Sequence, residues 1–235
     1  MHKKSAMPKP NSQPVSCQTC EVRHLSLFKS LCAEGVNELN DIKDCIIYKK
    51  NEPVFVEGAY PKGIFCIKAG KIKVFTIGES GKEQIIRIAK EGDVIGFRSL
   101  FSEEPYRLSA TTLEDCSVCV IKTDDFSKQV ENQPELLQAV LRELSKEAGE
   151  LALFIKTMAQ KTVRQRLAII LLVLNEIYKN QQINLSREDL ANFVGTATET
   201  VIRLLKDFKE EGVIEIHGRA IELLNVPLLV QEAER

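Results

Sequence analysis

The sequence has no long apolar run and no segment typical of a secretory signal. Its longest unbroken apolar run, Leu167 to Leu174, is far shorter than the roughly 20 residues that a helix needs to cross a bilayer. We therefore expect neither a membrane span nor a membrane partner. Near the amino terminus, Pro8, Pro10 and Pro14 stand where a signal peptide would have its apolar segment, so we expect a cytoplasmic protein.

The sequence also lacks an excess of either charge, with 32 Lys and Arg against 33 Asp and Glu. The net charge of -1 neither indicates nor excludes a nucleic-acid ligand, because a basic patch can be local. The three histidines form no catalytic pattern, and there is no phosphate-cradling loop or nucleophile–base pair. We expect no catalytic residues and no enzyme. The seven cysteines are an odd number, which favours buried thiols, metal ligands or redox sensors over a disulfide framework.

Composition changes along the chain predict four parts. Residues 1–16 are rich in Pro and Lys, which predicts a disordered tail. Residues 17–134 predict a β-domain, since short β-branched and aromatic runs are broken by glycine after short helices at 25–45. The predicted strands are residues 63–67, 71–77, 84–90, 108–113 and 115–121. Strands of this length and spacing are typical of a sandwich, barrel or jelly roll.

Residues 135–160 predict one long helix with an apolar seam. Seven apolar residues alternate steps of four and three, as in a heptad repeat. They are Leu137, Leu141, Leu144, Ala148, Leu151, Ile155 and Met158. One interpretation is a parallel homodimer, and the other is a helix packed on its own β-domain, for which a broader apolar stripe would be typical. We favour the homodimer, with a hinge at Gln160 and Lys161.

Residues 161–235 predict a winged helix-turn-helix domain that follows a helix over residues 162–179. Ser186 and Thr196 each precede an acidic residue by three positions, so each predicts a capping box that opens a helix. Gly195 supplies the tight turn between the two helices. This spacing is typical of DNA-binding helix-turn-helix motifs. Residues 213–216 and 220–224 then predict a small hairpin, the wing.

The second of these helices has a polar face that predicts contacts with DNA. Thr198, Glu199, Ile202 and Arg203 would meet base edges in the major groove. Glu199 can accept from a cytosine amino group, while Arg203 forks onto a guanine and is steadied by Glu199 one turn away. Ile202 either contacts a thymine methyl group or fills space against the preceding helix. Residues suited to phosphate contacts are Ser186, Thr196, Thr200, Lys206 and Arg219.

In this order of parts, and in several motifs, the chain resembles the CRP/FNR family of bacterial transcription regulators. The motifs are Phe55-Val56-Glu57-Gly58, residues 67–74, residues 92–97, Arg166-Leu167-Ala168 and residues 199–203. The resemblance implies an α+β fold with a cyclic-nucleotide-binding-like β-roll (a double-stranded jelly roll), a long dimerisation helix and a carboxy-terminal winged helix-turn-helix. It also implies a homodimer that binds double-stranded DNA at a palindrome with TGA-type half-site cores, with RNA polymerase as a further partner.

The resemblance implies an effector pocket in the β-roll, but not for cyclic AMP. Its residues would be Gly96, Phe97, Arg98, Ser99, Arg107, Leu108, Ser109, Ala110, Leu151 and Ala152. Phe97 stands where cyclic-nucleotide-binding members carry an acid for the ribose 2′-hydroxyl, and leaving that hydroxyl unpaired costs about 1 to 3 kcal/mol. Leu108 interrupts the phosphate-binding segment, and neither Leu151 nor Ala152 has a hydrogen-bonding side chain. The effector is therefore unknown.

Phe97-Arg98-Ser99 and residues 112–119 instead resemble the oxygen-sensing branch of the family. That branch holds an iron–sulfur cluster through three amino-terminal cysteines and one from the β-roll. The resemblance matches Cys17, Cys20 and Cys119 to three of these ligands. Ser26 stands at the remaining position, which leaves His24 or Cys32 as the substitute.

Other interpretations of the cysteines stay open. A zinc site of Cys17-x-x-Cys20 with Cys116 and Cys119 would need residues three apart on a strand to point the same way, whereas they point to opposite faces. Thiol redox switching and the absence of any metal are the alternatives. Cys45 and Cys66 are interpreted as core thiols. For the whole chain, the alternative function is a ligand-binding module that acts on a protein partner.

Overall fold

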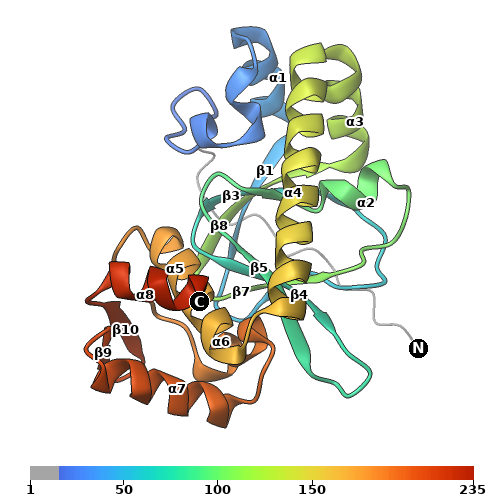
Figure 1. Cartoon of the computed structure of the whole chain (residues 1–235). Helices are drawn as coiled ribbons and strands as arrows, with labels where there is room; N and C mark the ends of the chain where they lie inside the picture. The colour runs from blue at the N-terminus through green and yellow to red at the C-terminus, as the bar shows by residue number, and fades with distance from the viewer. Residues whose placement is uncertain (1–15) are drawn as a thin grey trace. The chain divides into compact units, whose positions relative to one another are not determined.

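The computed structural model describes residues 16–235, which form two compact units (Figure 1). The first unit comprises the chain up to Val74 together with Ile88–Ala148. The second unit comprises Phe75–Arg87 and Gly149–Arg235. The predicted disordered tail, apart from residue 16, lies outside the described residues.

The predicted β-roll is confirmed as two four-stranded sheets. One sheet has the order β1 (Lys43–Tyr48), β8 (Cys116–Lys122), β3 (Gly63–Ala69) and β6 (Val94–Ile95). The other has the order β2 (Pro53–Phe55), β7 (Ser109–Thr112), β4 (Ile72–Ile77) and β5 (Glu83–Ala89). Both sheets contribute apolar side chains to one core, which is the sandwich arrangement. This core includes Ile46, Phe65, Ile67, Ile72, Val74, Val118 and Val120.

The other face of the β1-β8-β3-β6 sheet supports a second core with helices. These elements are the 3-10 turns η1 (Arg23–Leu25) and η2 (Leu27–Ser30) and the helices α1 (Ala33–Ile42), α2 (Phe97–Phe101) and α3 (Thr123–Asn132). Ile64 and Ile121 of the sheet pack there with Phe28, Phe97 and Phe126. The sequence analysis missed β1, β2, β6 and α3. Only Phe126, Gln129 and Val130 of α3 are buried, and so narrow a stripe gives little helical periodicity.

The long helix α4 (Pro134–Gln160) is confirmed and carries two apolar stripes. Leu136, Ala139 and Val140 are buried in the helix-facing core of the β-roll. The heptad seam is a different stripe, and its Leu141 is 54% exposed and its Ile155 66% exposed. Packing on the β-domain uses mainly residues outside the seam, although Leu144 of the seam also packs against this core. The rest of the seam, such as Leu141 and Ile155, keeps apolar surface for another occupant.

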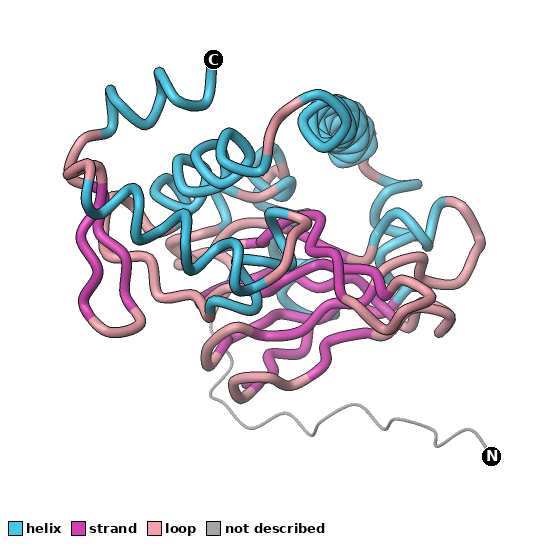
Figure 2. Tube along the Cα trace, turned by 60° about the horizontal axis from the view of Figure 1, so that its bottom comes forward, coloured by secondary structure: helices cyan, strands magenta, loops and turns pink. Residues whose placement is uncertain are grey.

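The second unit confirms the predicted winged helix-turn-helix. It contains α5 (Val163–Ile177), α6 (Arg187–Val194), α7 (Thr198–Glu210), the strands β9 (Ile214–His217) and β10 (Ala220–Leu223), and α8 (Val226–Glu234). Figure 2 shows β9 and β10 as a hairpin after α7. The buried residues of this unit include Leu167, Leu171, Leu190, Val201, Leu205, Phe208, Ile221 and Leu229. Helix α8 was not predicted. Among residues 16–235, no helix is long and apolar enough to cross a membrane.

Candidate DNA-binding site and sensor region

Helix α6 begins after Ser186 and ends at Gly195, as its sequence predicts. The Ser186 hydroxyl accepts a hydrogen bond from the Asp189 backbone N–H at 2.9 Å and so caps α6. Gly195 ends α6 with φ of 73°, a left-handed conformation that glycine adopts without a steric penalty. Both ends of α6, and the turn that follows it, are therefore set by local chemistry.

The prediction that Thr196 caps α7 is wrong. The N-cap is Ala197, which makes no side-chain cap hydrogen bond, so Thr196 lies one residue too early. The Thr196 N–H instead donates to the Ala191 carbonyl at 3.1 Å and extends the end of α6. Ala197 itself is exposed. The turn geometry after Gly195 takes precedence over the capping pattern because the backbone must finish one helix before it starts the next.

The predicted base-reading residues lie on the outer face of α7. Glu199, Ile202 and Arg203 are exposed, and Thr198 is half-buried at the first helical position. Ile202 is 52% exposed, so the interpretation of Ile202 as filler against α6 is wrong. Between Glu199 and Arg203 there is no ion pair among the described contacts, so the expected steadying of Arg203 is not present. Both polar groups are left for an external partner.

The predicted phosphate-contact residues differ in the contacts that they already make within the protein. The Ser186 hydroxyl already serves as a helix cap. Lys206 pairs with Glu210 at 3.5 Å on the exposed surface, a weak interaction that phosphate can replace. Thr200 is half-buried. Arg219 lies in the exposed β9–β10 turn, and its backbone carbonyl accepts a hydrogen bond from Arg187 Nη1 at 3.0 Å.

Arg187 is a residue of this site that the sequence analysis missed. Its guanidinium also reaches the Gly218 carbonyl at 3.4 Å, so α6 holds the tip of the wing through one side chain. Burial lowers the pKa of Arg187, and the nearby charge of Arg219 lowers it further. Two guanidinium groups at one end of the motif make a local basic patch despite the neutral composition of the chain.

Three further side chains fasten the helix-turn-helix, and of these only Arg166 belongs to a motif that carries the family resemblance. Lys82 Nζ, in the β4–β5 hairpin, donates to the Thr196 carbonyl at 2.7 Å. Gln84 Nε2 donates to the Asn192 carbonyl at 2.8 Å. Arg166 donates from Nη1 to the Met158 carbonyl at 3.1 Å and from Nη2 to the Gly195 carbonyl at 3.3 Å. Arg166 thereby links the end of α4 to the turn before α7.

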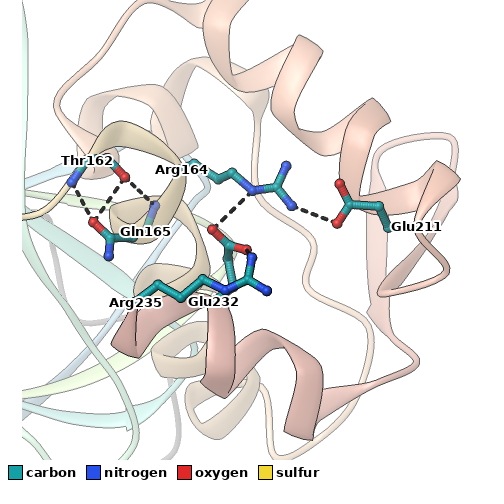
Figure 3. A network of polar contacts seen from close by, with 6 residues as sticks. All are labelled: Thr162, Arg164, Gln165, Glu211, Glu232 and Arg235. Carbon is teal, nitrogen blue, oxygen red and sulfur yellow. Dashed lines mark hydrogen bonds and ion pairs between the residues drawn. The ribbon is translucent and has the colours of Figure 1, made fainter.

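Arg164 organises the helices behind the motif (Figure 3). Its Nη2 lies 2.6 Å from Glu211 Oε2, and its Nε lies 3.1 Å from Glu232 Oε1. The guanidinium carbon lies 4.4 Å from the centre of the Phe208 ring, in cation–π geometry. Thr162 and Gln165 complete a capping box at the start of α5. One arginine therefore connects the start of α5 to the end of α7 and to α8.

At the family's nucleotide-binding positions, the residues of this chain pack and hydrogen-bond within the β-roll. Gly96 is the N-cap of α2 with φ of 90°, and Phe97 after it is only 1% exposed. The Phe97 ring belongs to the core between the sheet and the helices. On β7, the Ser109 hydroxyl accepts a hydrogen bond from the Glu57 N–H at 3.0 Å, and Ala110 is fully buried. These residues stabilise the β-roll itself.

The remaining predicted pocket residues do not form a polar site. Arg107 is exposed and pairs with Glu104 through two hydrogen bonds of 2.9 and 3.0 Å. Arg98 Nε lies 3.9 Å from Glu147 Oε2. Ser99 is buried, and Leu108 packs against the core between the two sheets. Leu151 is half-buried and Ala152 is exposed on α4, in the second unit.

The structure brings three of the predicted metal-binding cysteines together, with a different fourth residue. Cys17, Cys20 and Cys119 line one small cavity, and the fourth thiol that lines it belongs to Cys66. His24 and Cys32 are exposed and do not line this cavity, so the expectation that either one completes the set is wrong. Cys66 also packs against the core between the sheet and the helices, so its interpretation as a core thiol is confirmed. Cys116 belongs to the core between the sheets, on the opposite face of β8 from Cys119, as strand geometry predicts.

Two family models match the chain. The cyclic nucleotide-binding domain matches residues 45–133, and the Crp-like helix-turn-helix domain matches residues 165–232. These spans coincide with the β-roll and with the helices that carry the exposed face of α7. The fold and the site define a transcription regulator that binds DNA through a helix-turn-helix.

Full-length comparisons identify the family. Electron transport regulator A of Shewanella oneidensis is 31% identical over 222 residues, which cover 90% of this chain and 87% of that protein. The anaerobic regulatory protein of Haemophilus influenzae is 29% identical over 227 residues, with 92% and 87% covered. The crystal structure of a CRP/FNR-family transcriptional regulator from Eubacterium rectale has a TM-score of 0.74 at 16% identity, with 89% and 98% covered. The chain belongs to the CRP/FNR family.

Proposed function

We propose that this protein is a homodimeric transcription regulator that reads a palindrome with TGA-type half-site cores. The observation that carries the proposal is the exposed set of Glu199, Ile202 and Arg203 near the start of α7. These side chains supply an acceptor for cytosine, an apolar contact for a thymine methyl and a guanidinium fork for guanine. Thr198 stands where the cyclic-AMP-responsive branch has an arginine, so the bases outside the core differ from that branch.

The exposed seam of α4 supports the homodimer. An exposed stripe of apolar side chains repeated in heptads is typical of a helix that pairs with a partner helix. Pairing two copies would set two α7 helices about 34 Å apart, the distance between successive major grooves on one face of DNA. RNA polymerase is the further partner that we propose for the DNA-bound dimer.

We propose a signal other than cyclic AMP, acting on the β-roll. Phe97 is packed in the core, and Arg107 is already paired with Glu104. The Shewanella oneidensis relative is named for electron transport and the Haemophilus influenzae relative for anaerobic regulation. From these names we infer a signal connected with oxygen or respiratory electron flow.

The test is binding to a labelled duplex with two TGA half-sites, followed by fluorescence anisotropy at several salt concentrations. We expect the affinity for the palindrome to exceed that for a scrambled duplex by at least about 10³-fold. For both duplexes the affinity should fall steeply as salt rises, because bound phosphates release counterions. Equal, weak binding to both duplexes would reject sequence-specific recognition and favour a module that acts on a protein partner.

A further inference from the structure

Cys45 and Cys119 face each other across two neighbouring strands of the β-roll. Cys45 of β1 is directly opposite Cys119 of β8, which runs antiparallel to β1. Residues directly opposite one another in an antiparallel pair point to the same face, with Cα atoms about 4.5 to 5.5 Å apart. Disulfide bonds usually join residues whose Cα atoms are about 4.4 to 6.8 Å apart. The backbone at this pair therefore already has the spacing that a disulfide bond requires.

The two side chains are also turned toward each other. Their Sγ atoms lie 3.3 Å apart, close enough for one thiol to donate to the other. A disulfide bond is about 2.05 Å long, so the sulfur atoms have to approach by only roughly 1.2 Å. Rotation of the two side chains about their Cα–Cβ bonds can supply this approach. The strand register thus brings together two thiols that are far apart in the sequence.

Cys116 lies on the same strand and has a different environment. It points into the core between the sheets, where its thiol donates to the Lys71 carbonyl at 3.4 Å. Because its hydrogen bonds go to backbone carbonyls, it is a buried cysteine of β8 that serves as a control for Cys119.

Cys119 is the member of the pair that a small molecule can reach. It is half-buried and lines a cavity of about 30 Å³, whereas Cys45 is buried and does not line that cavity. A cavity needs at least about 10 to 15 Å³ to hold a water molecule. This cavity therefore admits a molecule of the size of hydrogen peroxide and excludes a peptide-sized oxidant such as oxidised glutathione.

The described residues do not fit the metal centre of the oxygen-sensing branch. Ser26 stands at the third amino-terminal position, and its hydroxyl donates to the Arg23 carbonyl at 2.7 Å and accepts from the Phe28 N–H. Among residues 16–235, no three Cys, His, Asp or Glu side chains are placed to hold a metal ion. The sulfur contact of Cys119 is with one other thiol, so the chemistry that this geometry offers is between two sulfur atoms.

The charged residues around the cavity suit the oxidation of a thiol. Arg23, Lys43 and Lys68 line it, and no acidic side chain of the described chain does so. Positive charge favours a thiolate and a departing hydroxide. The hydrogen bond with Cys45 and burial nevertheless raise the pKa of Cys119, while the charge of Lys43 acts in the opposite direction. Because the thiolate is the reacting form, we expect oxidation to need prolonged exposure to peroxide.

We propose that Cys45 and Cys119 are a redox-active pair that hydrogen peroxide converts to a disulfide within the β-roll. The proposal depends on the β-roll alone, so its failure would leave the proposed DNA recognition standing.

The reaction consumes one peroxide for each disulfide and has two steps. Cys119 Sγ, as a thiolate, attacks one peroxide oxygen, the O–O bond breaks, and the departing hydroxide takes up a proton to become water. Cys119 is then a sulfenic acid. Cys45 Sγ attacks the sulfur of Cys119, the S–O bond breaks, and the hydroxide leaves with the proton of Cys45 as a second water. The two sulfur atoms are oxidised, and both oxygens of the peroxide are reduced to water.

The first experiment maps disulfides in full-length wild-type protein. Reduced protein is treated with hydrogen peroxide over a time course, free thiols are blocked with N-ethylmaleimide, and the protein is digested with trypsin without reductant. We expect mass spectrometry to find peptide 44–49 joined to peptide 108–122 as the main disulfide within the chain, and dithiothreitol to separate them. Fragment spectra distinguish Cys119 from Cys116, which lie in the same peptide.

The exposed Cys32 shows in the same digest that the oxidant has acted. If Cys32 is oxidised while Cys45 and Cys119 both remain blocked as free thiols, the proposal is wrong. Conversion of Cys119 to a sulfinic acid while Cys45 stays free would also refute it, because Cys45 would then have failed to capture the sulfenic acid.

The second experiment tests which thiols form the pair. We expect Cys45→Ser to abolish the cross-link and to leave Cys119 as a sulfenic acid, so that a dimedone-type probe labels Cys119 severalfold more than in wild-type protein. Cys116→Ser and Cys66→Ser should form the cross-link as wild type does. Cys66 is the informative control because it is directly opposite Cys119 on the other side, on β3. A cross-link from Cys119 to Cys66 that persists in Cys45→Ser would overturn the assignment.

A third measurement needs no variant and applies even if Cys45→Ser does not fold. The disulfide closes a loop of roughly 75 residues, which restricts the unfolded chain and so stabilises the folded state. We therefore expect cross-linked wild-type protein to have a Tm several degrees above that of the reduced protein, and dithiothreitol to reverse the rise. An unchanged or lower Tm of the cross-linked protein would show that the native β-roll does not accommodate the bond, and the proposal would fail.

Discussion

The start of α7 and the start of α2 are two places where the family resemblance predicts contacts with a ligand, and they differ in what their side chains do. On α7, Glu199 and Arg203 are exposed and make no ion pair with each other. On α2, Phe97 is packed into the core, and on the loop after α2 Arg107 is paired with Glu104. The fold is the same as in the family at both places, but the side chains differ. Helix α7 exposes Glu199 and Arg203 with no ion pair between them, whereas α2 buries Phe97, and its exposed Arg98 lies 3.9 Å from Glu147.

This difference shows how far a shared fold supports a shared function. Backbone elements can be retained while the side chains that recognise a ligand are replaced by apolar packing, so function must be argued from the site. At α7 the family's DNA readout is chemically available. At α2 the acceptor for a ribose hydroxyl is absent, because Phe97 has no hydrogen-bonding atom.

The largest expected effect tests whether α7 acts as one of a pair. Leu141→Lys places like charges in the exposed seam of α4 and should convert a dimer to monomers, with more than about 100-fold loss of affinity for the palindrome. Light scattering and fluorescence anisotropy measure the two results. Leu141 is a sharper choice than Leu144, because Leu144 also packs against the β-roll core.

Leu153→Lys is the control for Leu141→Lys. Leu153 is an exposed leucine on the same helix outside the heptad seam. The variant adds the same charge and should remain dimeric with unchanged DNA affinity. If both variants remain dimeric, the dimer interface lies outside the α4 seam.

Arg203→Ala tests base readout by α7 directly. Loss of the guanidinium fork should cost about 1 to 3 kcal/mol on the TGA palindrome and relax the preference at one base pair in each half-site. Lys206→Ala is the matched control on the same face, since loss of a phosphate contact should weaken all sequences alike and reduce the salt slope by about 1. If Arg203→Ala weakens palindrome and scrambled duplexes equally, α7 does not read bases through this residue.

Much of the fold follows from local patterns that are strong in this chain. The heptads predicted α4, and the glycine-punctuated β-branched runs predicted five strands. Ser186 and Gly195 predicted the two ends of α6. The missed elements have weak local signals. Strand β1 begins with Lys43 and Asp44 and was assigned to the preceding helices, and α8 follows the wing with no pattern that requires a further helix. Tertiary packing of Cys45, Ile46 and Leu229 stabilises them.

The sites were predictable only where sequence neighbours form them. The outer face of α7 is set by helical periodicity, so Glu199, Ile202 and Arg203 could be assigned from spacing alone. The pairing of Cys45 with Cys119 and of Cys119 with Cys66 on neighbouring strands depends on strand order and register, which the sequence does not reveal. Arg187 and Lys82 reach backbone carbonyls more than 30 residues away, and such contacts leave no periodic signal.

Arg164→Ala tests whether the presentation of α7 depends on the helices behind it. The substitution removes ion pairs to Glu211 and Glu232 and the contact with the Phe208 ring, and the remaining carboxylates are partly buried. We expect the free energy of unfolding to fall by about 1 to 3 kcal/mol, measured by urea denaturation. Arg235→Ala is the control, because Arg235 pairs with the same Glu232 from a mostly exposed position and should change stability by less than about 0.5 kcal/mol. Equal effects of the two variants would show that the network does not support α7.

The smallest expected effect concerns α2. A ligand that binds the folded state at a concentration equal to its Kd stabilises by about 0.4 kcal/mol. Since Phe97 cannot pair with a ribose hydroxyl, we expect cyclic AMP at about 1 mM to raise the Tm by no more than about 1 °C. The TGA duplex in the same assay should raise the Tm by several degrees and so proves that the assay detects binding. A comparable rise in Tm with cyclic AMP would show that α2 and its neighbours still bind the nucleotide. If that rise is absent in Arg107→Ala, Arg107 leaves Glu104 to bind the phosphate of cyclic AMP.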